Sequence, residues 1–207
     1  MKTDSRLLTT TIIFALLVLS VSLSLGWAQQ KTAASAAAGP KLGLPILLTS
    51  CGQSPGPTQF KVFLDQLKMD YVQKLDATPA DLAKTPFKTL IIVTGASLKG
   101  MGAAGVSIDD EINRIKALIA AARKQNVKII GAHVEGMKRR AQGADPGDNS
   151  DEVSIDAVCP FSSLLIVKKE GDEDGRFTTI SKSKNIPMIS FEKNLDLANV
   201  LKELFGK

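Results

Sequence analysis

The sequence predicts an α/β fold in which a parallel sheet of five to six strands is covered by helices on both faces. Segments typical of strands and helices alternate from Leu44 to the end of the chain, which is the pattern of a parallel sheet. The run Leu90-Ile91-Ile92-Val93 is continuously apolar, as expected for a strand covered on both faces. The expected strands near residues 45, 89 and 127 are the most apolar, whereas segment 71–75 is half polar.

This contrast predicts the strand order. Apolar strands belong in the centre of a sheet, and a half-polar strand belongs at an edge. The order 2-1-3-4-5, with a sixth strand after the fifth, satisfies both conditions. The order 3-2-1-4-5-6 would instead place the apolar third strand at an edge. We therefore predict a flavodoxin-like doubly wound sheet whose switch point lies between the first and third strands.

The individual elements follow from the same patterns. Strands are expected at residues 45–49, 70–75, 89–94, 127–133, 163–167 and 187–190. Helices are expected at residues 58–68, 79–84, 108–125, 150–158, 176–184 and 195–205. The helix at 108–125 has the clearest pattern, because isoleucines at 108, 112, 115 and 119 share one face and Ser107 is a natural N-cap. Segment 145–151 is expected to be a surface loop that caps the following helix.

The N-terminal segment has the pattern of an export signal. An apolar run from Leu7 to Leu25 follows Lys2 and Arg6, and small residues at 26 and 28 favour cleavage after Ala28. We thus expect a signal peptide at 1–28, an Ala-rich linker at 29–43 and one α/β domain at 44–207 of a periplasmic or secreted protein. The alternative is an uncleaved anchor, since the run approaches the ~20 residues that span a bilayer. Membrane contact would then come only through this segment.

Composition narrows the possible partners. Without the three charged residues of the signal segment, the net charge falls from +5 to +4, which is too weak to indicate a nucleic-acid partner. The chain has one Tyr, and its one Trp leaves with the signal peptide, so a stacking surface for single strands is not expected. Cys51 and Cys159 are expected at opposite ends of the sheet as two free thiols, because a disulfide needs Cα atoms within ~7 Å.

A ligand pocket is expected beyond the carboxyl ends of the strands at the switch point, where sheets of this kind bind ligands. Hydroxyls, cations and glycines gather in the loops that follow the first, third and fourth strands. This combination suits a small anion, a carboxylate or a phosphate, although such loops are also rich in Gly and Ser for turn chemistry alone. The candidate ligand-binding residues are Ser50, Gly52, Gln53, Ser54, Gly95, Ser97, Lys99, Gly100, Gly102, His133, Arg139 and Arg140.

No cofactor is indicated by the motifs. Residues 100–105 match G-x-G-x-x-G, but five residues separate them from the preceding strand, whereas the dinucleotide fingerprint opens directly after its strand. His133 is the only histidine, which excludes a His-rich zinc site. A hydrolase or transferase would have to use His133 as its base, with a nearby Ser or Cys as nucleophile. A lone histidine at a strand end is more often a structural residue or a ligand contact.

Several short motifs occur together in the folded domain: Leu47-Leu48-Thr49-Ser50, Gly52-Gln53-Ser54, Lys99-Gly100, Gly102-Ala103-Ala104-Gly105, Arg139-Arg140, Glu170-Gly171-Asp172 and Asp174-Gly175. Taken together, they resemble an exported bacterial family known only as a domain of unknown function (family 6305). The resemblance implies export and spans Leu44 to Phe205. It brings no established activity, so no catalytic residue is transferred, and segment 142–151 is more elaborate than the family pattern.

The sequence is therefore compatible with three functions. An exported module that binds a small anion is the reading that the converging donors favour. An enzyme with His133 as base is the alternative. A protein-interaction domain with an incidental crevice is the third possibility, and its partner is not indicated.

Overall fold

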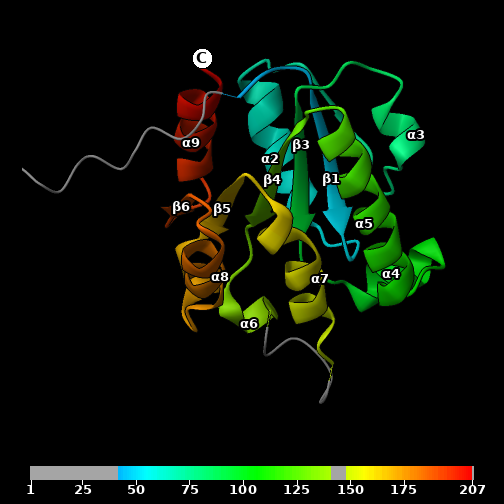
Figure 1. Cartoon of the computed structure of the whole chain (residues 1–207). Coiled ribbons are helices and arrows are strands. Elements are labelled where there is room, and N and C mark those ends of the chain that lie inside the picture. Colours follow the sequence, from blue (N-terminus) through cyan, green and yellow to red (C-terminus); the bar gives the residue numbers. More distant parts are fainter. Residues whose placement is uncertain (1–41, 141–147, 207) are drawn as a thin grey trace, which may run out of the picture. The chain divides into compact units, whose positions relative to one another are not determined.

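The computed structural model describes residues 42–140 and 148–206, and these residues build one all-parallel sheet (Figure 1). The strand order is β2-β1-β3-β4-β5-β6, which confirms the predicted fold class and order. The strands are β1 (Ile46–Cys51), β2 (Tyr71–Gln73), β3 (Thr89–Thr94), β4 (Lys128–His133), β5 (Leu164–Lys168) and β6 (Met188–Phe191).

Burial explains this order. Every residue of β1 and β3 is buried, and the two strands pair along their whole length from Ile46 beside Thr89 to Cys51 beside Thr94. The edge strand β2 has three residues, none of them buried, which agrees with its half-polar sequence. Because successive residues of a strand point to opposite faces, each central strand contributes apolar side chains to both layers of helices.

Helices cover both faces of the sheet. Helices α2 (Gly56–Gln66) and α9 (Asp196–Phe205) pack on the face that carries Leu48, Ile91 and Ile130. The opposite face is covered by α3 (Pro79–Leu82), α5 (Ile108–Lys124), α7 (Ser150–Val158) and α8 (Arg176–Lys184). Helix α5 begins as predicted, since Ser107 and Asp110 cap each other's backbone N–H groups.

Two short helices were not expected from the sequence. Helix α4 (Leu98–Ala104) contains two glycines and is a poor helix by propensity. It forms because the Ser97 hydroxyl accepts a hydrogen bond from the Gly100 N–H, Met101 is buried, and Gly105 ends the helix in the left-handed conformation. Helix α6 (Met137–Arg140) has only four residues and is held by tertiary contacts described below. Two 3-10 turns, η1 (Cys159–Phe161) and η2 (Lys169–Asp172), flank β5.

The chain is already packed at Leu42, whose N–H donates to the carbonyl of Leu204 on α9. The predicted signal peptide and residues 29–41 of the predicted linker lie outside the described residues. No helix in the described ranges is long and apolar enough to cross a membrane. Cys51 and Cys159 are free, as expected, and both are buried.

Candidate functional site

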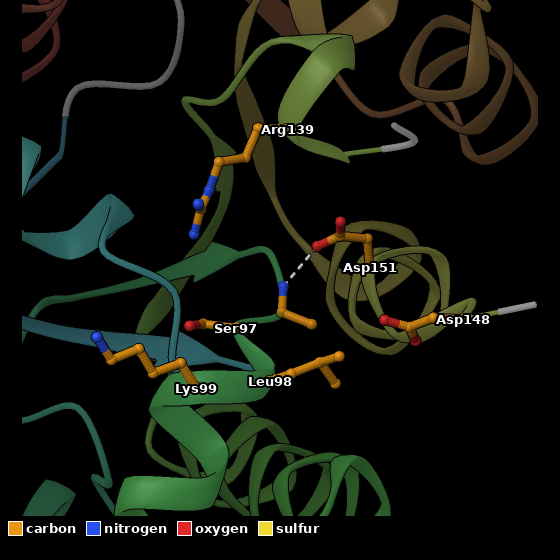
Figure 2. A pocket seen from close by; sticks show the side chains of 7 residues that line it. Ser97, Leu98, Lys99, Arg139, Asp148 and Asp151 are labelled. Atoms are coloured by element: carbon orange, nitrogen blue, oxygen red, sulfur yellow. Dashed lines mark hydrogen bonds between the residues drawn. The ribbon is translucent and has the colours of Figure 1, made fainter. Parts of the chain in front are cut away.

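A cavity of about 210 Å³ lies at the carboxyl end of the sheet. Its walls come from the start of α4, from α6 and from the start of α7, and we call it the charged cavity (Figure 2). It is lined by Ala96, Ser97, Leu98, Lys99, Arg139, Asp148 and Asp151. Three of these, Ser97, Lys99 and Arg139, are among the residues predicted from the sequence.

The crevice between β1 and β3 is closed by close contact of two loops. Ser97 N–H donates to the carbonyl of Gly52 at 2.8 Å. A Cβ atom on Gly52 would lie 2.7 Å from the carbonyl oxygen of Gly95, so the backbones approach more closely than any side chain allows. Both glycines adopt positive φ, at 97° and 129°. The cavity is consequently displaced from the β1–β3 boundary toward α6 and α7.

Helix α7 ties these two loops together. The Ser154 hydroxyl donates to the carbonyl of Cys51 at 2.8 Å and accepts from the Gly95 N–H at 3.0 Å. One turn earlier, Asp151 Oδ1 accepts from the Ala96 N–H at 2.5 Å. Segment 145–151 was expected to be only a capping loop, but Asp151 belongs to the buried first turn of α7 and contacts the loop after β3. No local pattern in the sequence indicates this contact, because the Ala96 N–H lies 55 residues away from Asp151 in the chain.

The cationic side of the cavity consists of Lys99 and Arg139. Lys99 is exposed, and among the described residues its ammonium takes part in no ion pair. Arg139 is half exposed, and its Nε donates to Glu135 Oε1 at 3.2 Å. Within the described ranges, its two terminal nitrogens make no hydrogen bond, and they remain available to a ligand.

The acidic side consists of Asp148 and Asp151. Asp148 is half-buried, and its Oδ1 accepts from the Ser150 N–H at 2.9 Å. Asp151 is only 6% exposed. Burial raises the pKa of Asp151 to about 6, against the opposing effect of the Ala96 hydrogen bond and with support from the nearby charges of Glu135, Glu152 and Asp148. The predicted list of ligand residues contained no acid, so this side of the cavity was missed.

Glu135 lies behind Arg139 and is as buried as Asp151. Its Oε2 has no hydrogen-bond partner among the described residues. Burial raises the pKa of Glu135, and the Arg139 guanidinium only partly opposes that effect. The cavity region therefore contains two buried carboxyl groups whose charged forms are incompletely stabilised by the protein.

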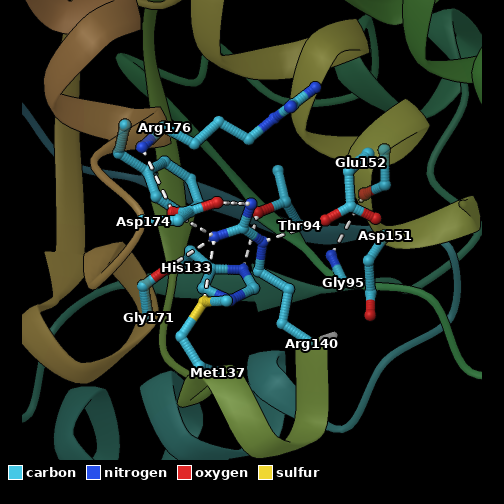
Figure 3. A network of polar contacts seen from close by, with 12 residues as sticks. Thr94, Gly95, His133, Met137, Arg140, Asp151, Glu152, Gly171, Asp174 and Arg176 are labelled. Atoms are coloured by element: carbon cyan, nitrogen blue, oxygen red, sulfur yellow. Dashed lines mark hydrogen bonds and ion pairs between the residues drawn. The ribbon is translucent and has the colours of Figure 1, made fainter. Parts of the chain in front are cut away.

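Arg140 was predicted to contact a ligand, but the structure places its guanidinium inside the protein (Figure 3). It donates to both carboxylate oxygens of Asp174, at 3.0 and 2.9 Å, and to the carbonyl of Gly171 at 2.8 Å. It also forms an ion pair with Glu152 at 3.3 Å. Arg140 thus fastens α6 to α7 and to the segment before α8, which fixes the neighbouring Arg139 at the cavity.

His133 is fully buried beside this network, with its ring 5.0 Å from the ring of Phe177. Its Nδ1 lies 3.1 Å from the Thr94 hydroxyl, and its Nε2 has no partner in the described chain. Burial, together with the charge of Arg140, lowers the pKa of His133 to about 4. Among the described residues no Ser hydroxyl or Cys thiol forms a hydrogen bond with it, so the hydrolase alternative stays a prediction.

The remaining predicted residues support the loops or lie apart from the cavity. Ser50 donates to the carbonyl of Leu75. Gln53 pairs with Ala96 in an isolated bridge, and the hydroxyl of buried Ser54 accepts from the Gly56 N–H. Gly100 lies against Gln53, since an added Cβ would be 2.5 Å from the Gln53 carbonyl oxygen, whereas Gly102 is exposed on α4 with open space around it.

A second buried ion pair holds the loop after β1. Glu111 on α5 accepts from the Gly52 N–H at 2.9 Å and pairs with Arg114 at 2.8 Å. Arg114 in turn donates to the carbonyls of Ser50 and Ala77. Burial alone would raise the pKa of Glu111, but the hydrogen bonds from Arg114 and Gly52 outweigh it and lower the pKa. No group of three His, Cys, Asp or Glu residues in the described ranges could hold a metal ion.

Comparison with known proteins gives a family and distant structural similarities. A sequence model described as "Domain of unknown function (DUF6305)" matches residues 43–205. No curated protein matches the chain. Among solved structures, a psychrotrophic esterase, EstA, from Pseudoalteromonas sp. is 10% identical with a TM-score of 0.32, covering 78% of this chain and 94% of that one.

Two further solved structures are similar at the same level. A putative acylhydrolase from Bacteroides fragilis is 11% identical with a TM-score of 0.35, over 80% of this chain and 77% of that one. A GDSL-like lipase from Bacteroides thetaiotaomicron is 12% identical with a TM-score of 0.33, over 70% and 66%.

Proposed function

The chain belongs to the family described as a domain of unknown function (DUF6305), and we propose that this domain binds a small ligand bearing an anionic group, a carboxylate or a phosphate, in the charged cavity. The observation that carries the proposal is the pair of cations on one side of the cavity, Lys99 and Arg139. Lys99 has no carboxylate partner within the described part of the chain, and Arg139 uses only its Nε internally.

Two features make this side of the cavity suited to an anion. The two terminal nitrogens of a guanidinium form a planar fork that matches a carboxylate or a phosphate. The Arg140 network holds α6 in place, so Arg139 is positioned before a ligand arrives and less freedom is lost on binding. The Ser97 hydroxyl also lines the cavity, although it already accepts the Gly100 N–H.

We also propose that the domain works outside the cytosol, on the strength of the apolar segment at 7–25 and its small residues at 26 and 28. The exported product should begin at Gln29. Intact-mass measurement on protein recovered from the periplasm or the medium tests this. A species that retains Trp27 in the membrane fraction would instead assign the segment as an anchor.

A thermal-shift panel tests the binding proposal. The purified protein is heated with inorganic phosphate, acetate, succinate, ribose 5-phosphate and each of the twenty standard L-amino acids. A probe at a hundredfold excess over its Kd should stabilise the fold by ~2.7 kcal/mol. Lys99→Gln and Arg139→Gln should each abolish the shift. Lys138→Gln is the matched control, because Lys138 is an exposed cation on α6, as Arg139 is, but does not line the cavity.

The outcomes are distinct. A shift that disappears in the Lys99 and Arg139 variants and persists in the Lys138 variant supports the proposal. A shift that survives both cavity variants shows that binding occurs elsewhere. If no probe of any class stabilises the protein, the proposed function is wrong.

A further inference from the structure

We propose that the ligand is zwitterionic, a small molecule of the amino-acid class whose ammonium group faces Asp148 and Asp151 while its anionic group faces Lys99 and Arg139. This inference rests on the proposed function and specifies its ligand class. It starts from the separation of charge in the cavity: Figure 2 shows Lys99 and Arg139 on one side and both aspartates on the other.

The charges around the cavity do not suit an anion alone. The two cations are opposed by three carboxylates, namely Asp148 and Asp151 in the lining and Glu135 behind Arg139. A ligand with only negative charge would gain from Lys99 and Arg139 but would be repelled by the aspartates across the cavity. A zwitterion adds no net charge, and its two ends complement the two sides.

The structural role of Asp151 does not require a negative charge. Its Oδ1 holds the Ala96 N–H, a task that the amide oxygen of an asparagine would perform equally well. Its Oδ2 accepts no hydrogen bond from the described residues, although the side chain is more than nine-tenths buried and lines the cavity. Burying a carboxylate without a partner is costly, so this oxygen is suited to a donor that comes from outside the protein.

Asp148 supports the same assignment. Its Oδ1 accepts from the Ser150 N–H, and its side chain lines the cavity on the Asp151 side. An ammonium group has three donors, which two carboxylates and one further acceptor can satisfy. The cavity volume of about 210 Å³ is below the usual range for drug-sized ligands, which favours a ligand of few heavy atoms.

Matched pairs of probes test this inference by isothermal titration at fixed salt. Every L-amino acid that stabilises the protein in the thermal-shift panel is compared with the carboxylate that lacks only its amino group, for example L-alanine with propionate. We expect the amino acid to bind at least tenfold more tightly, because a charge-assisted hydrogen bond is worth at least that factor. Asp151→Asn should remove most of this advantage and leave the affinity for the carboxylate unchanged or higher.

Two further variants make the result specific. Asp148→Asn should reduce the same advantage in part, and it serves as the second test if the Asp151 variant fails to fold. Asp109→Asn is the matched control, because Asp109 is exposed in the first turn of α5 and does not line the cavity. It should leave all affinities unchanged.

The failure of this inference is distinguishable from that of the proposed function. If phosphates or carboxylates without an amino group bind as tightly as the amino acids, or if no amino acid binds while another probe does, the ligand is a simple anion and the inference is wrong. If the aspartate variants retain the full preference for the amino acid, the assignment of the ammonium to these residues is wrong. The absence of all binding refutes both proposals.

Discussion

Glu111 on α5 and Asp151 on α7 are two buried acids near the first turns of neighbouring helices, and they differ in how far the protein compensates their charge. Glu111 is paired with Arg114 and accepts from the Gly52 N–H, and these contacts lower its pKa. Asp151 accepts one N–H and has no cation partner among the described residues, and burial raises its pKa to about 6. Both hold a loop at the carboxyl end of the sheet.

The difference teaches where this fold leaves charge uncompensated. Around Glu111 the protein supplies every contact, so that site stabilises the loop after β1 and offers nothing to a ligand. Around Asp151 the protein supplies one contact and leaves the second oxygen to the cavity. Uncompensated buried charge is characteristic of functional sites, where it reduces stability in exchange for binding.

The largest expected effect comes from breaking the satisfied site. Glu111→Ala leaves the Arg114 guanidinium, whose side chain is 13% exposed, without its carboxylate, and it leaves the Gly52 N–H without an acceptor. We expect a loss of about 4 kcal/mol in the free energy of unfolding, because removing one partner of a buried ion pair leaves the other charge buried and uncompensated. Urea denaturation measures this. A loss below 1 kcal/mol would show that water replaces the carboxylate.

A smaller loss is expected at Arg140. Arg140→Met removes a fully buried guanidinium, but the carboxylates left behind, Asp174 and Glu152, are 40% and 30% exposed and remain hydrated. We expect a loss of about 2 kcal/mol in stability, less than at Glu111 for that reason. Binding of the probe identified in the thermal-shift panel should also weaken, because α6 no longer positions Arg139. Unchanged affinity at 25 °C would contradict this positioning role.

Neutralising the uncompensated acid should stabilise the protein. Asp151→Asn keeps an oxygen that accepts the Ala96 N–H, and it removes a carboxylate whose pKa is raised by burial. The free energy of unfolding at pH 7 should therefore rise by about 1 to 2 kcal/mol. The Asp151 carboxyl binds its proton more tightly in the folded state than in the unfolded state. Protonation of Asp151 therefore stabilises the fold fully below about pH 4, and this stabilisation is lost as the pH rises through about 6.

The gain of the variant should therefore vanish when both proteins are denatured at pH 4. Glu111 gives the opposite trend: its pKa is lowered, so its contribution is present above the unfolded value of about 4.3 and is lost as the pH falls through the folded value. A gain for Asp151→Asn that is constant from pH 4 to 7 would show that charge is not its cause.

The smallest effect is expected at Asp148. It is half-buried and its oxygen caps the Ser150 N–H, which asparagine can also do. Asp148→Asn should change the free energy of unfolding by no more than ~0.5 kcal/mol at any pH. A change as large as that of Asp151→Asn would mean that the two aspartates act as one coupled unit, and the double variant would then measure their interaction.

The sequence predicts the parts of this fold that depend on local patterns. The run Leu90–Val93 identifies a central strand, Ser107 marks the start of α5, and the bounds of α7 and α8 agree with the structure. Helix α4 could not be predicted, because its two glycines give it a low helix propensity. The Ser97 cap and the buried Met101 stabilise it instead.

The composition of the cavity could be predicted only in part. Lys99 and Arg139 could be proposed because they follow strands that end at the same edge of the sheet. Asp151 and Arg140 could not be assigned, because their partners, the Ala96 N–H and Asp174, lie 55 and 34 residues away in the chain. Pairing over such distances leaves no periodic signal, so a buried Arg140 and an exposed Arg139 look the same in the sequence.

The Ser154 contacts have a consequence for the order in which the molecule folds. This hydroxyl joins Cys51 and Gly95, residues 103 and 59 positions before it, so both loops acquire their final form only after α7 has docked. Closing such long loops is entropically expensive, and contacts of this separation are typically made late. The β1–β3 pair can assemble from the first half of the chain, whereas the cavity must wait for the second. The central β1–β3 pair would therefore form before the binding site during folding.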